Sequence, residues 1–193
     1  TIPHLDKSGN VIKLKQGFAN DEIENPLANE TPRSYSKRHG NTLTTNAGYF
    51  SMDNTSVIYN KPQGIVIHDG RVICDNTEFL PETFVNVLNY FAIKEDNTLT
   101  YYPQNTSAQT MINDGVKEAV LGQTPIVVDG TNYKELYPDA PGNWNSPYPH
   151  TIYAQKSNKD IIVMCCNGKG TTDEQGMNLN QCANLLINDY DVE

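Results

Sequence analysis

One segment, residues 42–50, combines residue types that could form the rim of a ligand pocket. A run of β-favouring residues ends in Asn46, whose amide offers two donors and one acceptor at a fixed point. Gly48 would let a ligand approach the backbone closely, and Tyr49 and Phe50 would supply flat apolar surfaces. The same residues also suit a strand that enters a turn through an Asx-type hydrogen bond. The segment alone leaves both interpretations open.

Four further motifs follow this segment, and their order is more informative than any one of them. In chain order they are Pro125–Gly130, Pro149–Thr151, Asn167–Lys169 and Gly176–Leu179. In order and spacing the set resembles the phosphodiester glycosidase domain, the family of the lysosomal uncovering enzyme that removes N-acetylglucosamine from a mannose-phosphate diester. The resemblance extends from Thr31 to the last residue.

The chain departs from the family pattern at three motif positions. His150 stands where the family has Arg in a Pro-Arg-Thr motif, and Asn167 and Lys169 stand for Asp and Arg in an Asp-Gly-Arg motif. The Asp-Gly-Gly-Gly-Ser motif of the family would follow Glu193. We therefore expect residues 1–193 to form a single domain that is incomplete at its C-terminus, with a further segment or a second chain completing the fold.

The resemblance implies a site for a carbohydrate or glycosyl-phosphate ligand. A phosphate leaves with little acid assistance, so cationic or amide donors around the diester are expected in place of the carboxylate pair of most glycosidases. The candidate catalytic residues are Asn46, His150 and Asn167. The candidate substrate-binding residues are Gly48, Tyr49, Thr151, Lys169, Gly176 and Trp144.

Several of these residues also have an ordinary structural explanation. Trp144 lies in a polar loop, where its ring could stack on a sugar or anchor the loop as a half-buried side chain. His150 could be an exposed residue at a strand edge, and Lys169 a solvated turn residue. Asn167-Gly168 is also a tight-turn signal. The sequence leaves these alternatives open.

Composition excludes some classes of function. The net charge of −9 argues against non-specific nucleic-acid binding, which needs a basic surface. No apolar run approaches the roughly 20 residues that span a bilayer, so we expect no membrane insertion. The four cysteines fit no zinc-binding pattern and are expected to be free thiols, which suits assembly in a reducing cytoplasm. The sequence assigns no metal ligand and no cofactor.

Local signals predict a mixture of strands and helices. A capped helix is expected over 31–40, hairpins over 64–74 and 84–102, a helix over 107–113, and strands at 126–128, 151–155 and 161–166. Asn178 should cap a helix with one apolar face, made of Leu179, Cys182, Ala183, Leu186 and Ile187. The expected fold is α+β, with a largely antiparallel twisted sheet carrying helices, similar to the phosphodiester glycosidase fold.

Two functional hypotheses follow. The first is a hydrolase that cleaves a sugar-1-phosphodiester in a cell-surface or wall glycan. The second is a non-catalytic glycan-recognition or structural module of a phage virion or surface assembly, which suits the three substituted motif residues. Both predict an extracellular or virion-associated protein.

Overall fold

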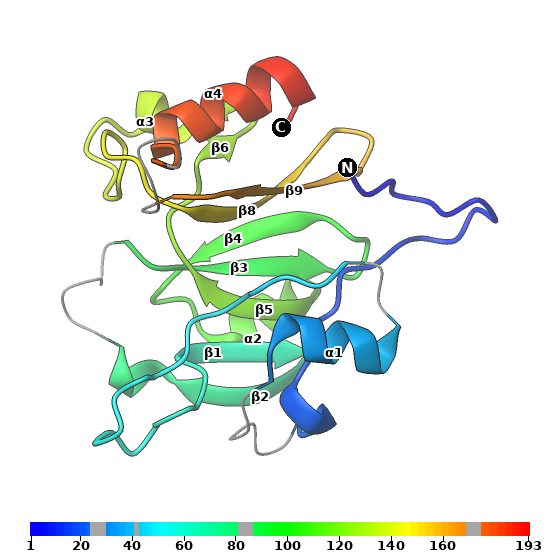
Figure 1. Ribbon diagram of the computed structural model, residues 1–193, viewed down its shortest axis with the longest axis vertical. Coiled ribbons are helices and arrows are strands. Elements are labelled where there is room, and N and C mark those ends of the chain that lie inside the picture. The colour runs from blue at the N-terminus through cyan, green and yellow to red at the C-terminus, as the bar shows by residue number, and fades with distance from the viewer. Residues whose placement is uncertain (24–29, 41–42, 81–86, 169–174) are drawn as a thin grey trace. The chain divides into compact units, whose positions relative to one another are not determined.

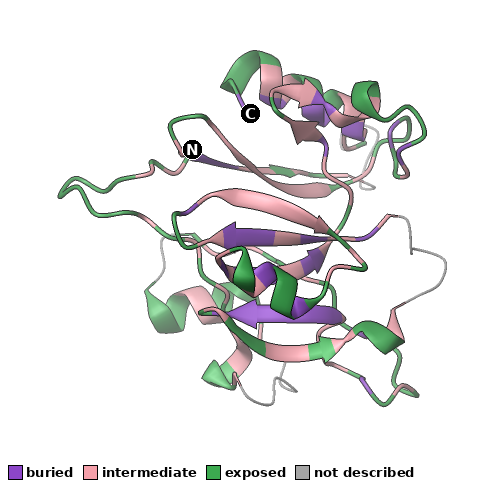
Figure 2. Ribbon diagram, turned by 180° about the vertical axis from the view of Figure 1, so that it is seen from behind, coloured by how far each residue is buried: buried purple, intermediate pink, exposed green. Residues whose placement is uncertain are grey.

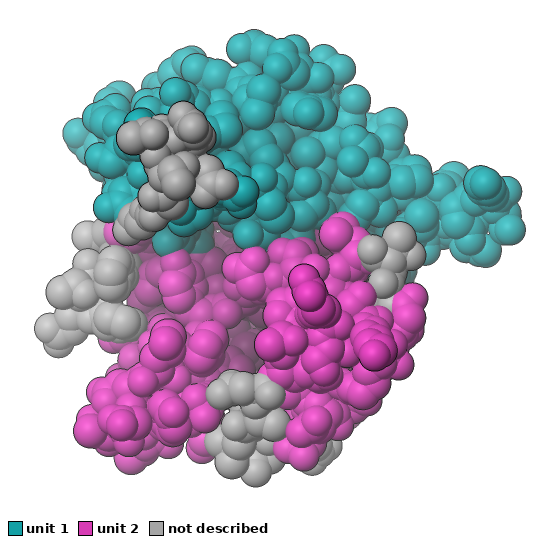
Figure 3. All heavy atoms as spheres, in the orientation of Figure 1, with its two compact units in different colours: residues 1–13, 96–99, 123–193 teal, residues 14–95, 100–122 magenta. Residues whose placement is uncertain are grey.

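The computed structural model describes residues 1–23, 30–40, 43–80, 87–168 and 175–193. The chain divides into two compact units, coloured separately in Figure 3. Unit 1 comprises residues 1–13, 96–99 and 123–193, and unit 2 comprises residues 14–95 and 100–122. Each unit has its own cluster of buried apolar residues. The expectation of one domain with an incomplete C-terminus stays a prediction.

Unit 2 is built on a five-stranded sheet in the order β2-β1-β5-β3-β4 (Figure 1). The neighbours β1–β2, β1–β5 and β3–β5 all pair antiparallel. The strands are β1 (Gly64–His68), β2 (Arg71–Asn76), β3 (Asn89–Lys94), β4 (Leu99–Pro103) and β5 (Val116–Gly122). Every residue of β1 is buried, which Figure 2 shows as a continuous purple strand. The prediction of an α+β fold with an antiparallel sheet is confirmed.

The β1–β2 hairpin forms where the sequence predicts it. Asp69 and Gly70 both have positive φ, 49° and 74°, as a two-residue hairpin turn requires. Strand β5 was not predicted, although it lies at the centre of the sheet. Its interior carries Lys117 and Glu118, so it lacks the apolar alternation that marks a strand. Tertiary pairing with β1 and β3 overrides that weak local signal.

The described helices of unit 2 are η1 (Ala19–Asp21), α1 (Pro32–His39), η2 (Thr77–Phe79) and α2 (Ala108–Asn113). Among them, α1 and α2 begin at side-chain caps and lie where the sequence predicts helices, whereas η1 and η2 have no side-chain cap. The Thr31 hydroxyl accepts from the third residue of α1, and Gly40 ends that helix in a left-handed conformation. Helix α2, nearest the viewer in Figure 2, buries Met111 in the core of the sheet.

Unit 1 contains two small hairpins and two helices. The strands are β6 (Val127–Val128), β7 (Thr131–Asn132), β8 (His150–Gln155) and β9 (Ile161–Cys166), and the helices are α3 (Tyr133–Leu136) and α4 (Leu179–Tyr190). Isolated bridges add Ile2 beside Ile161 and Val192 beside Lys156, so both terminal segments pair with the β8–β9 hairpin. The hairpins confirm the prediction, whereas α3 was not predicted.

Helix α4 has the start and the apolar face predicted from its sequence. The Asn178 side chain accepts from the backbone of Gln181, and the Gln181 side chain accepts from the backbone of Asn178. Leu179, Cys182, Ala183 and Leu186 are buried, and Ile187 is half-buried. This face packs with Trp144 and Ile162 in the core of unit 1.

One local prediction is wrong, and another is confirmed over its described residues. Residues 43–47 form no strand, and pairing begins instead at Phe50 and Ser51, which bridge to Pro62 and Tyr59. The expected hairpin over 84–102 is present as β3 and β4, while its residues 84–86 lie outside the described residues. Within the described part of the chain, no helix has the length and apolar character to cross a bilayer.

Replacing Leu186 by Ala should destabilise the protein by about 2–5 kcal/mol, because a fully buried leucine leaves a cavity when it is truncated. Asn188→Ala is the matched control, since Asn188 is exposed on the same helix. Urea unfolding of both variants gives the comparison, and equal midpoints would show that α4 is not packed as described.

Candidate functional site

Three of the sequence motifs meet around His150 in unit 1. The β8–β9 register pairs His150 with Cys166, so Asn167-Gly168 directly follows the partner of His150. A bridge between Tyr148 and Met177 brings the Gly176 motif to the same place. The candidate site is therefore built from the start of β8, the end of β9 and the segment that leads into α4.

Two glycines hold these segments in direct backbone contact. A Cβ atom on Gly168 would lie 2.7 Å from the Pro149 nitrogen, and one on Gly176 would lie 2.4 Å from the Tyr148 carbonyl oxygen. Gly176 also has a φ of +84°, in the left-handed region that favours glycine. No side chain fits at either position without moving the backbone that carries His150.

Two neighbours contact His150, one at the backbone and one at the ring. The backbone N–H donates to the Cys166 sulfur at 3.2 Å, and the ring Nε2 lies 3.0 Å from the Met177 carbonyl oxygen. A carbonyl oxygen only accepts, so Nε2 carries the proton of that bond. Burial lowers the pKa of His150, although the bond to Met177 opposes the shift. The neutral ring then presents Nδ1 as an acceptor.

This geometry argues against the role that the resemblance implied for His150. The Nε2 proton is already donated to Met177, and the neutral ring has no second proton for an anion. In the described part of the chain, no group hydrogen-bonds to Nδ1. His150 is therefore placed to accept a proton or a hydroxyl hydrogen bond.

The remaining candidates of unit 1 have mixed outcomes. Asn167 is exposed next to β9, and Thr151 follows His150 on β8, where its hydroxyl is the acceptor for the thiol of Cys165 at 3.9 Å. Lys169 lies outside the described residues. The structure thus brings His150, Asn167 and Gly176 together.

Trp144 does not form a sugar platform. It is 3% exposed within the core of unit 1, and its indole N–H donates to the Pro141 carbonyl at 3.0 Å. A ring with both faces covered has no surface left for a sugar to stack on. The prediction of a substrate-binding role is wrong for this residue, which instead anchors its loop.

The start of α4 offers an anion fewer donors than its sequence suggests. The Leu179 N–H donates to the Asn143 carbonyl at 3.2 Å, and the Gln181 N–H donates to the Asn178 side chain at 2.9 Å. Capping therefore uses two of the first backbone donors that a phosphate would need.

The candidates of unit 2 lie in a segment that crosses β5. A Cβ atom on Gly48 would lie 2.8 Å from that of Val120, and the Tyr49 N–H donates to the Leu121 carbonyl at 3.3 Å. Asn46 is exposed, and Tyr49 and Phe50 are 39% and 48% exposed. The close approach predicted at Gly48 is thus made to the sheet, while the aromatic side chains reach solvent.

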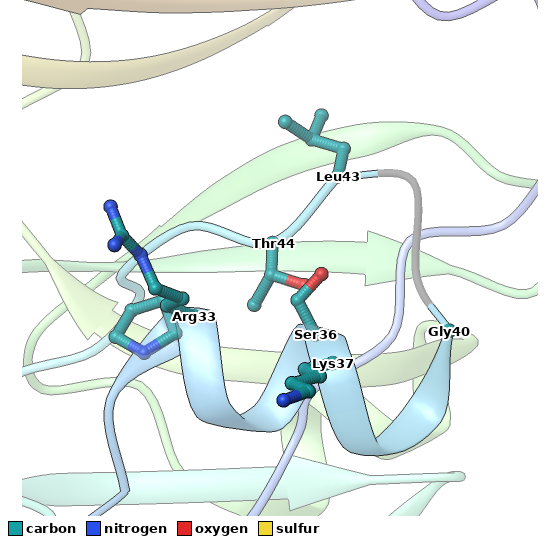
Figure 4. A pocket seen from close by; sticks show the side chains of 7 residues that line it. Arg33, Ser36, Lys37, Gly40, Leu43 and Thr44 are labelled. Atoms are coloured by element: carbon teal, nitrogen blue, oxygen red, sulfur yellow. The ribbon is translucent and has the colours of Figure 1, made fainter.

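Unit 2 also has an open groove that the sequence analysis missed. It lies between α1 and residues 43–44 and has a volume of ≈ 630 Å³ (Figure 4). Arg33 and Lys37 line it from consecutive turns of α1, and neither forms an ion pair with a residue that the structure describes. Their spacing of four residues on a predicted helix was the available signal.

Comparison with known proteins decides the family. A model of the phosphodiester glycosidase (NAGPA) family matches residues 39–193. The chain belongs to the phosphodiester glycosidase family. The resemblance inferred from the ordered motifs is confirmed.

A solved structure has a similar fold. It is the zebrafish N-acetylglucosamine-1-phosphodiester alpha-N-acetylglucosaminidase (NAGPA) catalytic domain auto-inhibited by its pro-peptide, with a TM-score of 0.52 and 20% sequence identity. The match covers 76% of this chain and 47% of the zebrafish chain, so this chain spans about half the length of that relative. No curated protein matches the sequence. At this identity the likeness concerns the fold.

Replacing Gly176 by Ala should disrupt the site because it adds a backbone clash to the strain of a left-handed residue. Gly9 is the matched control, since its φ of +85° is nearly the same but a Cβ there meets nothing within 4 Å. We expect Gly9→Ala to cost roughly 1–2 kcal/mol and Gly176→Ala clearly more. Urea unfolding measures the difference, and equal costs would contradict the close packing at Tyr148.

The lowered pKa of His150 predicts a pH dependence of stability. As pH falls through the unfolded pKa of about 6.5, the unfolded chain takes up the proton first, so the free energy of unfolding decreases. Above that pH the stability that comes from burying the neutral His150 ring is fully present. It is lost as pH falls from the unfolded pKa to the folded pKa. Wild type should therefore lose more stability than His150→Gln between about pH 7.5 and pH 5.5 in urea unfolding. Parallel losses would show that burial does not shift this histidine.

Proposed function

We propose that this protein hydrolyses a glycosyl phosphodiester, cleaving the bond between the anomeric carbon of a sugar and a phosphate oxygen. Membership of the phosphodiester glycosidase family supports the reaction class. The single observation that carries the proposal is the convergence of three family motifs on a histidine with a fixed ring and an acceptor nitrogen.

The chemistry assigns a role to that nitrogen. Water must add to the anomeric carbon and lose a proton, while the phosphate leaves with the bonding electron pair as a monoester. A neutral His150 with its Nε2–H held by Met177 can accept the proton from water, or a hydrogen bond from a sugar hydroxyl, at Nδ1. A lowered pKa keeps the ring neutral near pH 7, as either role requires.

Taken by itself, the groove of unit 2 offers a cationic surface that would suit an anionic ligand. Arg33 and Lys37 line it, and neither forms an ion pair with a described residue. Arg binds phosphate oxygens through two parallel donors, and Lys adds a point charge. These residues support an anionic ligand on a chain whose net charge is −9.

A second candidate function is glycan recognition without catalysis. It is favoured by the substitutions at the family motif positions. The most important is Asn167, which stands where the family has an ionisable Asp. An amide can bind sugar hydroxyls through two donors and an acceptor but cannot act as an acid or a base. This function needs the same residues around His150 and predicts binding without turnover.

The ligand source and location are parts of the same proposal. We propose that the sugar belongs to a cell-surface or wall glycan and that the protein is extracellular or part of a phage virion. All four cysteines are free, which agrees with folding in a reducing compartment before release. Cell fractionation and analysis of purified virions would test the location.

The decisive experiment uses a methyl diester of α-N-acetylglucosamine 1-phosphate as substrate. We expect wild type to release N-acetylglucosamine, detected by NMR at the anomeric proton. His150→Ala should lower the rate by roughly 10²-fold or more, because the proton acceptor is lost. His39→Ala is the control, since His39 is exposed and bonds to Asp21.

His150→Arg separates the two roles of this residue. If Nδ1 accepts a proton, Arg cannot replace it and the variant should be as slow as His150→Ala. Retained activity in His150→Arg would restore the anion-binding role implied by the family motif. Binding without hydrolysis in wild type would favour the recognition module, and absence of both would reject both functions.

A further inference from the structure

A cluster of ionisable side chains lies on the sheet of unit 2, apart from the motifs used above. His68 ends β1, Asp69 begins the hairpin turn, and Glu118 lies on the neighbouring strand β5. His68 and Glu118 are 7% and 6% exposed, whereas Asp69 is open to solvent. Each residue offers one nitrogen or oxygen atom that could bind a metal, and these three atoms lie within 4.8 Å of one another.

Glu118 fixes the orientation and the tautomer of the His68 ring. The Nδ1 of His68 lies 2.9 Å from Oε2 of Glu118, and the amide of Gln16 donates to the same oxygen at 2.9 Å. The other carboxylate oxygen accepts from the Asp69 backbone N–H at 3.4 Å. A buried carboxylate with three donors around it remains an acceptor, so Nδ1 carries the proton.

The other nitrogen of the ring then faces a second carboxylate. Nε2 of His68 is 3.6 Å from Oδ2 of Asp69, which is too long for a hydrogen bond between them. It matches the separation of roughly 3.4 Å that two ligand atoms have when both bind one tetrahedral zinc ion at about 2.1 Å. Phe18 covers the ring edge-on at 5.2 Å between ring centroids.

We propose that His68 Nε2 and Asp69 Oδ2 form a binding site for a divalent transition metal such as Zn²⁺. Glu118 takes the outer position of a carboxylate–histidine–metal arrangement, in which the partner of the other ring nitrogen orients the ligand and raises its basicity. Two protein ligands leave the remaining positions to water or to an oxygen of a bound molecule. An imidazole with a carboxylate is a donor set that suits Zn²⁺ better than Mg²⁺.

The alternative is a purely structural charge pair, with an imidazolium between two carboxylates. That state would draw Nε2–H to hydrogen-bonding distance of Asp69, and the observed 3.6 Å does not meet this. Lys15 already lies 3.5 Å from the other oxygen of Asp69, but both partners are mostly exposed and their attraction is weak. A divalent ion would outcompete it.

Asp69→Asn is the test variant because it removes the ligand charge and keeps the turn. Asn-Gly is as favourable as Asp-Gly in this hairpin, and the pairing of Asp69 with Lys15 adds little. Asp129→Asn is the matched control, since Asp129-Gly130 forms the same kind of turn, with φ values of 49° and 68°. The full chain, freed of metal with a chelator, is titrated with ZnCl₂ by calorimetry.

Wild type and Asp129→Asn should bind one equivalent of zinc with the same affinity, and Asp69→Asn should bind that equivalent at least tenfold more weakly. Glu118→Gln should weaken it by roughly 10–100-fold. In ¹⁵N spectra of the histidine rings, zinc should shift Nε2 of His68 and leave Nδ1 protonated. No zinc binding in wild type, or equal binding in Asp69→Asn, would overturn the proposal and leave the cluster with a structural role in the sheet.

Discussion

Backbone contact at two glycines is the constraint on which the candidate site depends. At Gly168 and Gly176 the chain passes so close to Tyr148 and Pro149 that no β-carbon fits. This contact sets the distance between β8 and the segment before α4, and so puts the Met177 carbonyl within reach of the His150 ring. The capped start of α4 holds Met177 in turn, since Asn178 is both its neighbour and the cap.

Local signals predicted the elements whose cause is itself local. The Thr31 hydroxyl caps the start of α1. An Asp-Gly pair connects β1 to β2 because both residues tolerate positive φ. The same reasoning failed for β5, whose Lys117 and Glu118 interrupt the apolar pattern. That strand forms because it pairs with β1 and β3, and partners 22 or more residues away cannot be recognised in a short window of sequence.

In the candidate site, the sequence predicted the positions of the residues better than their roles. The order of the motifs predicted one site for Asn46, His150, Asn167 and the start of the Asn178 helix. The register of β8 and β9 and the Tyr148–Met177 bridge bring His150, Asn167 and Gly176 together in unit 1, whereas Asn46 belongs to unit 2 and its part in the site stays a prediction. Their roles depend on contacts that no motif encodes. His150 becomes an acceptor because Met177 takes its only proton, and Trp144 becomes a core residue because Pro141 and α4 enclose it.

The two Asp-Gly turns of this chain show which properties come from the motif and which come from the surrounding fold. Asp69-Gly70 and Asp129-Gly130 have nearly the same backbone angles, and by sequence they are the same signal. They differ in the residue before the turn, which is His68 in the first and Val128 in the second, and in the position of β5, which places Glu118 against His68. A buried carboxylate must be matched by donors or by positive charge, and here it orders a histidine whose free nitrogen faces a second carboxylate. The histidine before the turn and the unpredicted strand together are therefore the reason why the proposed metal site belongs to one hairpin and not to the other.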